Sequence, residues 1–250
     1  MGLTRPLTAH LPRLAAWLEP FTCPMPAYRP PKERERDLLL TGLGLGASAT
    51  TLMLLTLVAL RPTPNRVDVA LTRLLQRRHS RRVRRAMALI SLPGFAPLEH
   101  ALTVGTALNF WSFGYRREAL FTLLTMGAGA ITGVVKVAVG RPRPDLSLRR
   151  SSVLLRDNSF PSGHCAHYAA FYGYLFYLAR RSMAPSPLRS AILALCAGLI
   201  VLAPPSRVYL GHHWTSDVVA GNLLGLTYLF ALIEAYEQLA VTQRAPSTVS

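Results

Sequence analysis

The chain has 250 residues; half of them are hydrophobic and only 16% are charged. This composition excludes an intrinsically disordered protein, because disordered chains are poor in apolar residues, and three cysteines are too few for a disulfide-stapled secreted domain. The formal net charge is +16, nearly all of it from arginine, which points to nucleic acid, an anionic membrane surface or a phosphate-bearing substrate as the partner.

The chain begins with a polar segment, 1–36, which lacks the apolar core of a signal peptide. Residues 38–60 follow, 23 residues without a charge, and a helix of this length crosses about 30 Å of hydrocarbon. Five further apolar runs predict additional spans. We therefore expect an all-α, polytopic membrane bundle of about six transmembrane helices in one domain, 37–240, followed by a tail, 241–250. The expected spans are 38–60, 93–113, 119–139, 163–180, 188–206 and 216–238.

An arginine-rich segment, 61–85, lies between the first two expected spans and carries nine arginines against one acidic residue, Asp68. Nucleic-acid binding would favour aromatic residues interleaved with the arginines, and the segment contains none. We therefore expect no nucleic-acid partner. The segment instead predicts a surface helix on anionic lipid headgroups, although its apolar residues do not separate cleanly onto one face.

The first of three polar clusters near the later spans is Lys136–Asp145, which reads KVAVGRPRPD. Charged residues in such places cost about 2.5–3.5 kcal/mol each and need a compensating role. Two prolines stiffen the backbone around Arg141 and Arg143, which suits several donors that converge on one anion. The same arginines would also reach lipid headgroups, and these residues alone do not separate Arg141 from Arg143.

The second cluster, Phe160–His164, reads FPSGH and predicts a helix start with Ser162 as the N-cap. Backbone N–H groups at a helix start favour an anion, Gly163 allows close approach to it, and His164 projects from the first turn. A simple cap followed by an interfacial histidine would give the same pattern. His164 and His167 have a spacing that suits metal ligands, but no further ligand cluster supports them, and we expect no metal.

The third cluster, Ser206–Asp217, reads SRVYLGHHWTSD. Arg207 follows an apolar run, and His213 and Asp217 are four residues apart, which places them on one face of the last expected helix. A carboxylate one turn from an imidazole can fix its tautomer and leave the other ring nitrogen free as a base or nucleophile. His212 points elsewhere. Simple helix capping would also produce this spacing.

Together the clusters supply three cations, a helix N-terminus, two histidines and a carboxylate, which is the set of groups that phosphoryl transfer needs. They resemble the three-part signature of the type-2 phosphatidic acid phosphatase / vanadium haloperoxidase superfamily, in particular its membrane lipid phosphate phosphatase branch. No position of the signature departs from the pattern. The matching residues are Lys136, Arg143-Pro144, Pro161-Ser162-Gly163-His164, Ser206-Arg207, His213 and Asp217.

The resemblance implies a phosphatase that works through a phosphohistidine and requires no metal or other cofactor. His213 would attack phosphorus, Asp217 would orient it, and His164 would protonate the leaving group. Arg141 and Asp145 are left as supporting residues. The residues implied to hold the phosphate oxygens are Lys136, Arg143, Ser162, Gly163 and Arg207.

The implied substrates are phosphatidic acid, phosphatidylglycerol phosphate or polyprenyl phosphates and diphosphates, and a site at the membrane edge favours such lipids over a soluble ester. Lysine and arginine are nearly balanced between the two sides of the expected bundle, so they do not orient it. The resemblance implies a plasma-membrane protein whose site faces away from the cytoplasm. Two alternatives stay open: a vanadate-dependent haloperoxidase-like enzyme, whose members are usually soluble, and a non-catalytic membrane transporter or lipid-binding protein.

Overall fold

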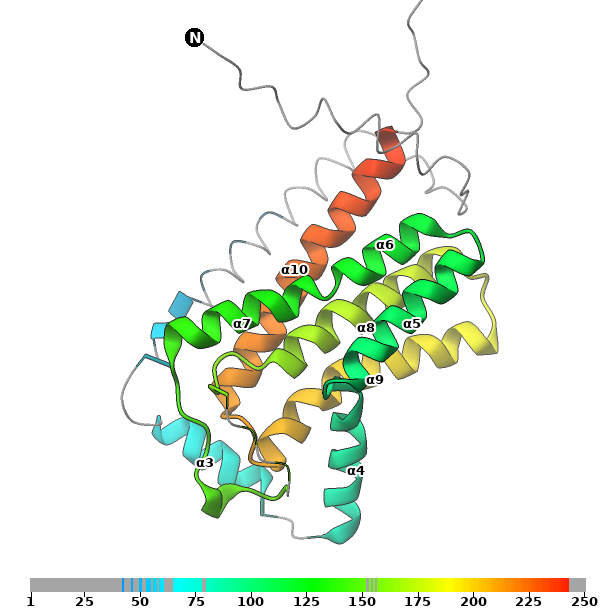
Figure 1. The fold of residues 1–250 in the computed structure, drawn as a ribbon. Coiled ribbons are helices and arrows are strands. Elements are labelled where there is room, and N and C mark those ends of the chain that lie inside the picture. Colours follow the sequence, from blue (N-terminus) through cyan, green and yellow to red (C-terminus); the bar gives the residue numbers. More distant parts are fainter. Residues whose placement is uncertain are drawn as a thin grey trace, which may run out of the picture.

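The computed structural model describes residues 65–242 except 78, 79, 152, 154 and 156, together with scattered positions between 42 and 60. The expected segment 1–36 and most of the expected span 38–60 lie outside the described residues. Helices and no strand occur among the described residues (Figure 1), which confirms the all-α expectation. The elements are α3 (Arg66–Leu75), α4 (Arg81–Ser91), η2 (Leu92–Gly94), α5 (Leu98–Ser112), α6 (Arg116–Leu124), α7 (Gly127–Val139), η3 (Leu146–Leu148), α8 (Gly163–Ser182), α9 (Pro187–Tyr209) and α10 (Thr215–Thr242).

Helix α8 lies at the centre of the bundle, packed against α9 and α10 with α7 beside it (Figure 1). Small residues make this close packing feasible, and Ala166 and Ala170 on α8 are fully buried. On the facing helix α10, a Cβ atom at Gly221 would lie 2.4 Å from the carbonyl oxygen of Ser162, and one at Gly225 would lie 2.4 Å from that of Ala166. Backbone contact therefore sets the separation of α8 and α10.

Three described helical stretches are long and apolar enough to cross a membrane: Arg116–Val139, Pro187–Tyr209 and Thr215–Leu239. The pair Arg81–Gly94 and Leu98–Ser112, bent by 55°, adds a fourth if it acts as one broken span. The chain is thus an integral membrane protein with several spanning helices. The count of six spans is not confirmed by the part of the chain that the structure describes.

The expected spans and the observed helices differ for two physical reasons. The expected span 163–180 does form a helix, the 20-residue α8, but it is an interior helix that carries two histidines and four tyrosines, which lower its hydropathy. The expected span 93–113 is interrupted near its start, because η2 separates α4 from α5 at the bend. The last helix, α10, continues to Thr242, two residues into the expected tail.

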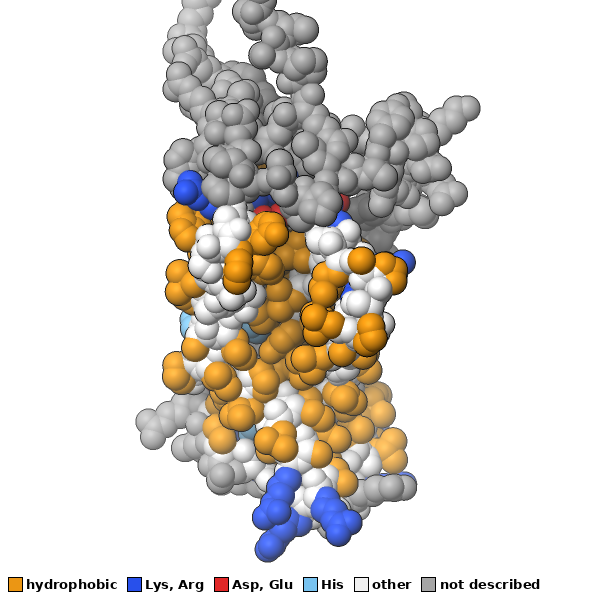
Figure 2. All heavy atoms as spheres, turned by 90° about the vertical axis from the view of Figure 1, so that its right-hand side faces the viewer, with side chains coloured by type: hydrophobic (Ala, Val, Ile, Leu, Met, Phe, Trp, Pro, Cys, Tyr) orange, Lys and Arg blue, Asp and Glu red, His pale blue; other side chains and the backbone are white. Residues whose placement is uncertain are grey.

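The outer surface of the bundle is apolar along much of its length. Figure 2 shows apolar side chains across the middle of one face, with lysine and arginine towards its two ends. This distribution is typical of a protein whose middle contacts hydrocarbon and whose ends contact headgroups and water. Exposed apolar residues on α5, α7 and α9 include Leu108, Val134, Val137, Leu195 and Val201.

The arginine-rich segment 61–85 forms parts of two helices, α3 and α4, rather than the single surface helix expected. Helix α3 turns polar side chains towards the protein and leaves apolar ones exposed. Gln76, at its C-cap, donates through Nε2 to the carbonyl oxygens of Leu148 at 2.7 Å and Tyr209 at 3.1 Å. The segment therefore packs against the end of α9. The buried polar residues on this side are Asp68, Thr72 and Gln76.

Candidate active site

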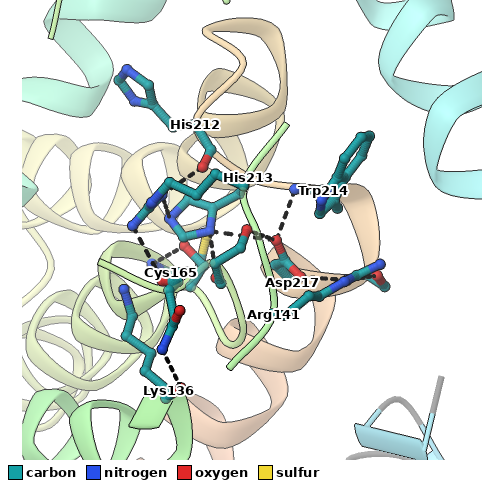
Figure 3. A network of polar contacts seen from close by, with 12 residues as sticks. Lys136, Arg141, Cys165, His212, His213, Trp214 and Asp217 are labelled. Atoms are coloured by element: carbon teal, nitrogen blue, oxygen red, sulfur yellow. Dashed lines mark hydrogen bonds and ion pairs between the residues drawn. The ribbon is translucent and has the colours of Figure 1, made fainter. Parts of the chain in front are cut away.

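The three polar clusters meet at one end of the bundle, where α7 ends, α8 begins and α9 connects to α10 (Figure 3). A cavity of about 750 Å³ opens there. The candidate residues in its lining are Lys136, Arg143, Gly163, His164, Arg207 and His213. Ser162 and Asp217 are fully buried next to this lining. The structure thus brings all the candidate residues together.

Arg207, on the last turn of α9, is only 1% exposed. Its Nη1 donates to Ser91 Oγ at 2.7 Å, and its guanidinium lies 4.9 Å from the centre of the Phe95 ring. Its Nε and Nη2 have no hydrogen-bond partner, and no carboxylate of the described residues pairs with it. A buried cation without a counter-ion is costly, so this guanidinium is suited to an anion that enters the cavity.

Lys136 and Arg143 share a carboxylate that the motif comparison had not singled out, Asp157. Arg143 Nη2 donates to Asp157 Oδ1 at 2.7 Å, and Lys136 forms an ion pair with Oδ2. Partial burial raises the pKa of Asp157, but hydrogen bonds and charges from Lys136 and Arg143 outweigh it and lower the pKa to about 2. The Asp157 carboxylate is therefore ionised at neutral pH.

The two ring nitrogens of His213 have different surroundings. Nδ1 lies 2.8 Å from the backbone carbonyl oxygen of Ser159 and donates its hydrogen to it, since a carbonyl oxygen only accepts. Nε2 then carries the lone pair and lies 3.2 Å from Arg143 Nη1 in the cavity. Burial, followed by the charges of Arg143, Arg207 and Lys136, holds the pKa of His213 well below its usual value. The imidazole is neutral, and its Nε2 lone pair faces the cavity, where it accepts a hydrogen bond from Arg143 Nη1.

Asp217 lies beside His213 but does not hydrogen-bond to it directly. Its Oδ2 is 3.6 Å from His213 Nδ1 and accepts from the Ser159 hydroxyl and from the Trp214 backbone N–H at 2.8 Å. Ser159 therefore connects the two residues, because its carbonyl oxygen binds His213 and its hydroxyl binds Asp217. Sequence reasoning missed Ser159, which lies just before the FPSGH cluster and outside the signature.

Arg141 holds Asp217 from the other side (Figure 3). Its Nη1 donates to Asp217 Oδ1 at 2.5 Å, and its Nη2 donates to Asp68 Oδ2 at 2.7 Å. Asp68 also accepts from the backbone N–H of Ser216 at 2.8 Å, near the start of α10. Sequence reasoning gave Arg141 a supporting place and did not assign Asp68 one. The sequence signal that could have singled out Asp68 is its position as the one acidic residue among the nine arginines of the 61–85 segment.

His164, in the first turn of α8, lines the cavity, and its Nε2 has no hydrogen-bond partner among the described residues. The Phe95 ring packs edge-on against it at 4.5 Å between ring centres. His167 does not join His164: its Nδ1 lies 3.3 Å from Glu99 Oε1 on α5. Within the described residues, no group of three or more His, Cys, Asp or Glu is placed to hold a metal.

Ser162 is the N-cap of α8, as expected, and its hydroxyl accepts from the Cys165 backbone N–H at 3.5 Å. Gly163, the first helical residue, faces the cavity. His212 contributes its carbonyl oxygen, which accepts from Arg143 Nη1 at 2.5 Å. Burial and then the charges of Arg207, Arg143 and Arg149 lower the pKa of the His212 ring to about 3, so this ring is neutral too.

These features define an integral membrane protein with a cavity in which a neutral histidine lies among lysine and arginine side chains. The fold is similar to two solved structures. One is a transmembrane PAP2 type phosphatidylglycerolphosphate phosphatase from Bacillus subtilis, with a TM-score of 0.64, 24% identity, and coverage of 76% of this chain and 96% of that one. The other is LpxE from Aquifex aeolicus, with a TM-score of 0.51, 21% identity, and coverage of 68% and 96%.

Residues 117–239 match the model of the PAP2 superfamily, so this part of the chain is a PAP2 superfamily domain. Phosphatidylglycerophosphatase B of Bacillus subtilis is 34% identical over 132 residues, which are 50% of this chain and 62% of that protein. Lipid A 4'-phosphatase of Rhizobium leguminosarum is 32% identical over 129 residues, which are 48% of this chain and 54% of that protein. The chain thus spans about half to three-fifths of the length of these relatives.

Proposed function

We propose that this protein is a membrane phosphatase that removes phosphate from a lipid phosphate through a phosphohistidine intermediate. The observation that carries the proposal is the buried Arg207 guanidinium, which has unmet donors in the cavity that also holds the lone pair of His213 Nε2. The relatives named as lipid phosphatases support the same substrate class. The exposed apolar side chains on α5, α7 and α9 support a substrate that arrives from the membrane.

The cations would bind the phosphoryl oxygens and stabilise the charge that spreads over them in the transition state. Arg207 has donors free for this task, and Lys136 and Arg143 would share theirs between phosphate and Asp157. The Gly163 N–H at the start of α8 would add a backbone donor, with Ser162 fixing the helix start. Each of these groups lies in or next to one cavity.

In the first step, the His213 Nε2 lone pair would form a bond to phosphorus while the bond from phosphorus to the leaving lipid oxygen breaks. His164, in its protonated form, would donate a proton to that oxygen. In the second step, water would attack phosphorus, the P–N bond would break, and His164 would recover a proton from the water. Free phosphate and a lipid alcohol are the products.

Asp217 would act as a positioning residue. Its carboxylate fixes Ser159, whose carbonyl oxygen accepts from His213 Nδ1, and its negative charge 3.6 Å from that nitrogen favours the imidazole becoming positive during attack. The buried pair of Arg141 and Asp68 would hold this carboxylate in place.

The test is phosphate release by the purified, detergent-solubilised protein with a chelator present throughout. The panel is phosphatidic acid, phosphatidylglycerol phosphate, a polyprenyl diphosphate and a water-soluble ester. We expect release from at least one lipid and a loss of about 1,000-fold or more in His213→Ala. His212→Ala is the matched comparison: it removes the neighbouring ring, which does not line the cavity, and should cost far less.

Three results would contradict the proposal. They are an inactive wild type on every lipid, equal losses in His213→Ala and His212→Ala, and faster hydrolysis of the soluble ester than of any lipid. Vanadate-dependent, halide-dependent peroxidase activity in a protein inactive on all four phosphates would favour the haloperoxidase-like alternative. An inactive protein that still binds lipid would favour the transporter or lipid-binding alternative.

We also propose that the protein lies in the plasma membrane with its cavity facing away from the cytoplasm. Asp145 is exposed on the rim of an outer pocket beside the cavity, and Cys165 and Cys196 are buried. Asp145→Cys, made in a Cys23→Ser background, should therefore react with a membrane-impermeant thiol reagent in intact cells. Labelling only after permeabilisation would place the cavity on the cytoplasmic side.

A further inference from the structure

One carboxylate pairs with two of the three lysine and arginine side chains that line the cavity among the described residues. The Asp157 side chain pairs with both Lys136 and Arg143, and its backbone carbonyl oxygen also accepts from Arg143 Nε at 2.8 Å. The side chain is 53% exposed, so it is accessible to solvent. Asp157 lines both the catalytic cavity and an adjoining outer pocket of about 330 Å³, and therefore stands at their boundary.

The net charge of the lysine, arginine and Asp157 side chains around the proposed phosphate position balances that of one phosphate group. Among the described residues, the lysine and arginine side chains that line the cavity are Lys136, Arg143 and Arg207, and Asp157 cancels one of their three charges. The remaining two positive charges match a phosphate monoester dianion. A diphosphate carries one further negative charge and would need another cation.

Apart from His164, whose proton goes to the leaving oxygen in the proposed mechanism, the leaving-group side of the cavity offers no cation from lysine or arginine within the described residues. From His164 the lining continues past Phe95, at the end of η2, to Glu99 in the first turn of α5. Glu99 Oε1 lies beside Gly129 of α7, 4.0 Å from where a Cβ would be. Gly129 is seven residues before Lys136, or about 10 Å along the helix. A second phosphate on this side would therefore meet a carboxyl group and no lysine or arginine of the described lining.

Building on the proposed function, we propose that Asp157 is a specificity-determining residue that restricts the site to a single phosphate group. The enzyme therefore prefers a lipid phosphate monoester to a lipid diphosphate. Asp157 does so by pairing with Lys136 and Arg143, which leaves the site too little positive charge for a second phosphate. Glu99 reinforces the preference from the leaving-group side.

The experiment compares two substrates with the same prenyl chain, one a monophosphate and the other a diphosphate, so that only the number of phosphates differs. We expect the wild type to have the higher kcat/KM on the monophosphate. Asp157→Asn should move the ratio towards the diphosphate by about tenfold, the factor for one unit charge about 6 Å away at an effective dielectric constant of about 40. Asp157→Glu keeps the charge and should keep the preference.

A second measurement does not depend on turnover. Inhibition or thermal stabilisation by inorganic phosphate and by pyrophosphate reports how many phosphate groups the cavity accepts. In Asp157→Asn, pyrophosphate affinity should rise about tenfold more than phosphate affinity, and added salt should weaken this difference. A merely structural role for Asp157 would change both ligands alike and would not respond to salt in this way.

The failure of this inference and the failure of the proposed function give different results. A wild type that favours the diphosphate, or an Asp157→Asn ratio within twofold of wild type, overturns the role of Asp157 and leaves the phosphatase activity intact. An inactive wild type overturns the proposed function, and the pyrophosphate measurement then still tests Asp157. Asp157→Ser replaces Asp157→Asn if the latter does not fold, with the same expected direction.

Discussion

Arg141 and Arg207 lie at the same end of the bundle and are both buried, but they differ in their partners. Arg141 pairs with two buried carboxylates, those of Asp68 at 2.7 Å and Asp217 at 2.5 Å. Arg207 donates one hydrogen bond, to the Ser91 hydroxyl, and its other two guanidinium nitrogens have no hydrogen-bond partner. Burial alone therefore does not distinguish Arg207, for which we propose phosphate binding, from Arg141, whose charge is paired within the protein. The distinguishing feature is an unmet charge that faces a cavity.

The largest effect we expect is on activity, from Arg207→Met. Removal of a cation that binds the phosphoryl oxygens should lower kcat/KM by about 1,000-fold. The melting temperature should stay level or rise, because the substitution removes a buried charge that has no counter-ion. Steady-state kinetics and thermal unfolding in detergent measure the two quantities. A melting temperature that falls in step with activity would contradict the distinction between the two arginines.

The opposite pattern is expected for Arg141→Met. This variant leaves Asp68 and Asp217 buried without their cation and should lose about 3–5 kcal/mol of stability. Adding Asp68→Asn should restore part of the loss, because one of the two unpaired carboxylates is then gone. Thermal or denaturant unfolding of the single and double variants checks this. If the double variant is no more stable than Arg141→Met, Arg141 and Asp68 do not act as a pair.

The smallest effect concerns the pH dependence of His213. Its lowered pKa keeps the nucleophile neutral to lower pH, so the acidic limb of kcat/KM should lie below the usual histidine value of about 6.5. Arg143→Gln removes a cation that disfavours the imidazolium, so the limb should move to higher pH, by about one unit. A pH–rate profile of both proteins measures this. A shift to lower pH would show that Arg143 does not act on His213 in this way.

The short-range spacing of polar residues in the sequence predicted the side chains that meet at the cavity. His164 and His213 were recognisable because each belongs to a compact cluster near a helix end, and the fold brings those ends together. Arg143 was separated from Arg141 only by the resemblance to the family signature. The all-α architecture was recognisable from the apolar runs. The sequence did not reveal that α8 lies inside the bundle. Its polar side chains, which are buried there, are also typical of a helix at the edge of a membrane.

The residues that sequence reasoning missed act through contacts that only the folded chain creates. Asp68 and Arg141 are 73 positions apart, and neither spacing nor composition indicates that they meet. Ser159 acts partly through its backbone carbonyl oxygen, which any residue possesses. Asp157 stands in the segment between two clusters, and its pairing with Lys136 depends on how that segment folds back over the end of α7.

The glycines of α10 have a consequence for how this protein tolerates change. His164 stands on α8 and His213 leads into α10, and the two helices touch at Gly221 and Gly225 through bare backbone. The spacing between the proposed proton donor and the proposed nucleophile therefore depends on two glycines, about 6 Å apart along α10, that have no Cβ atom. An alanine at either glycine would place its Cβ atom 2.4 Å from the carbonyl oxygen of Ser162 or Ala166 and push α8 and α10 apart. The separation of the two histidines would then change although the substitution touches neither of them.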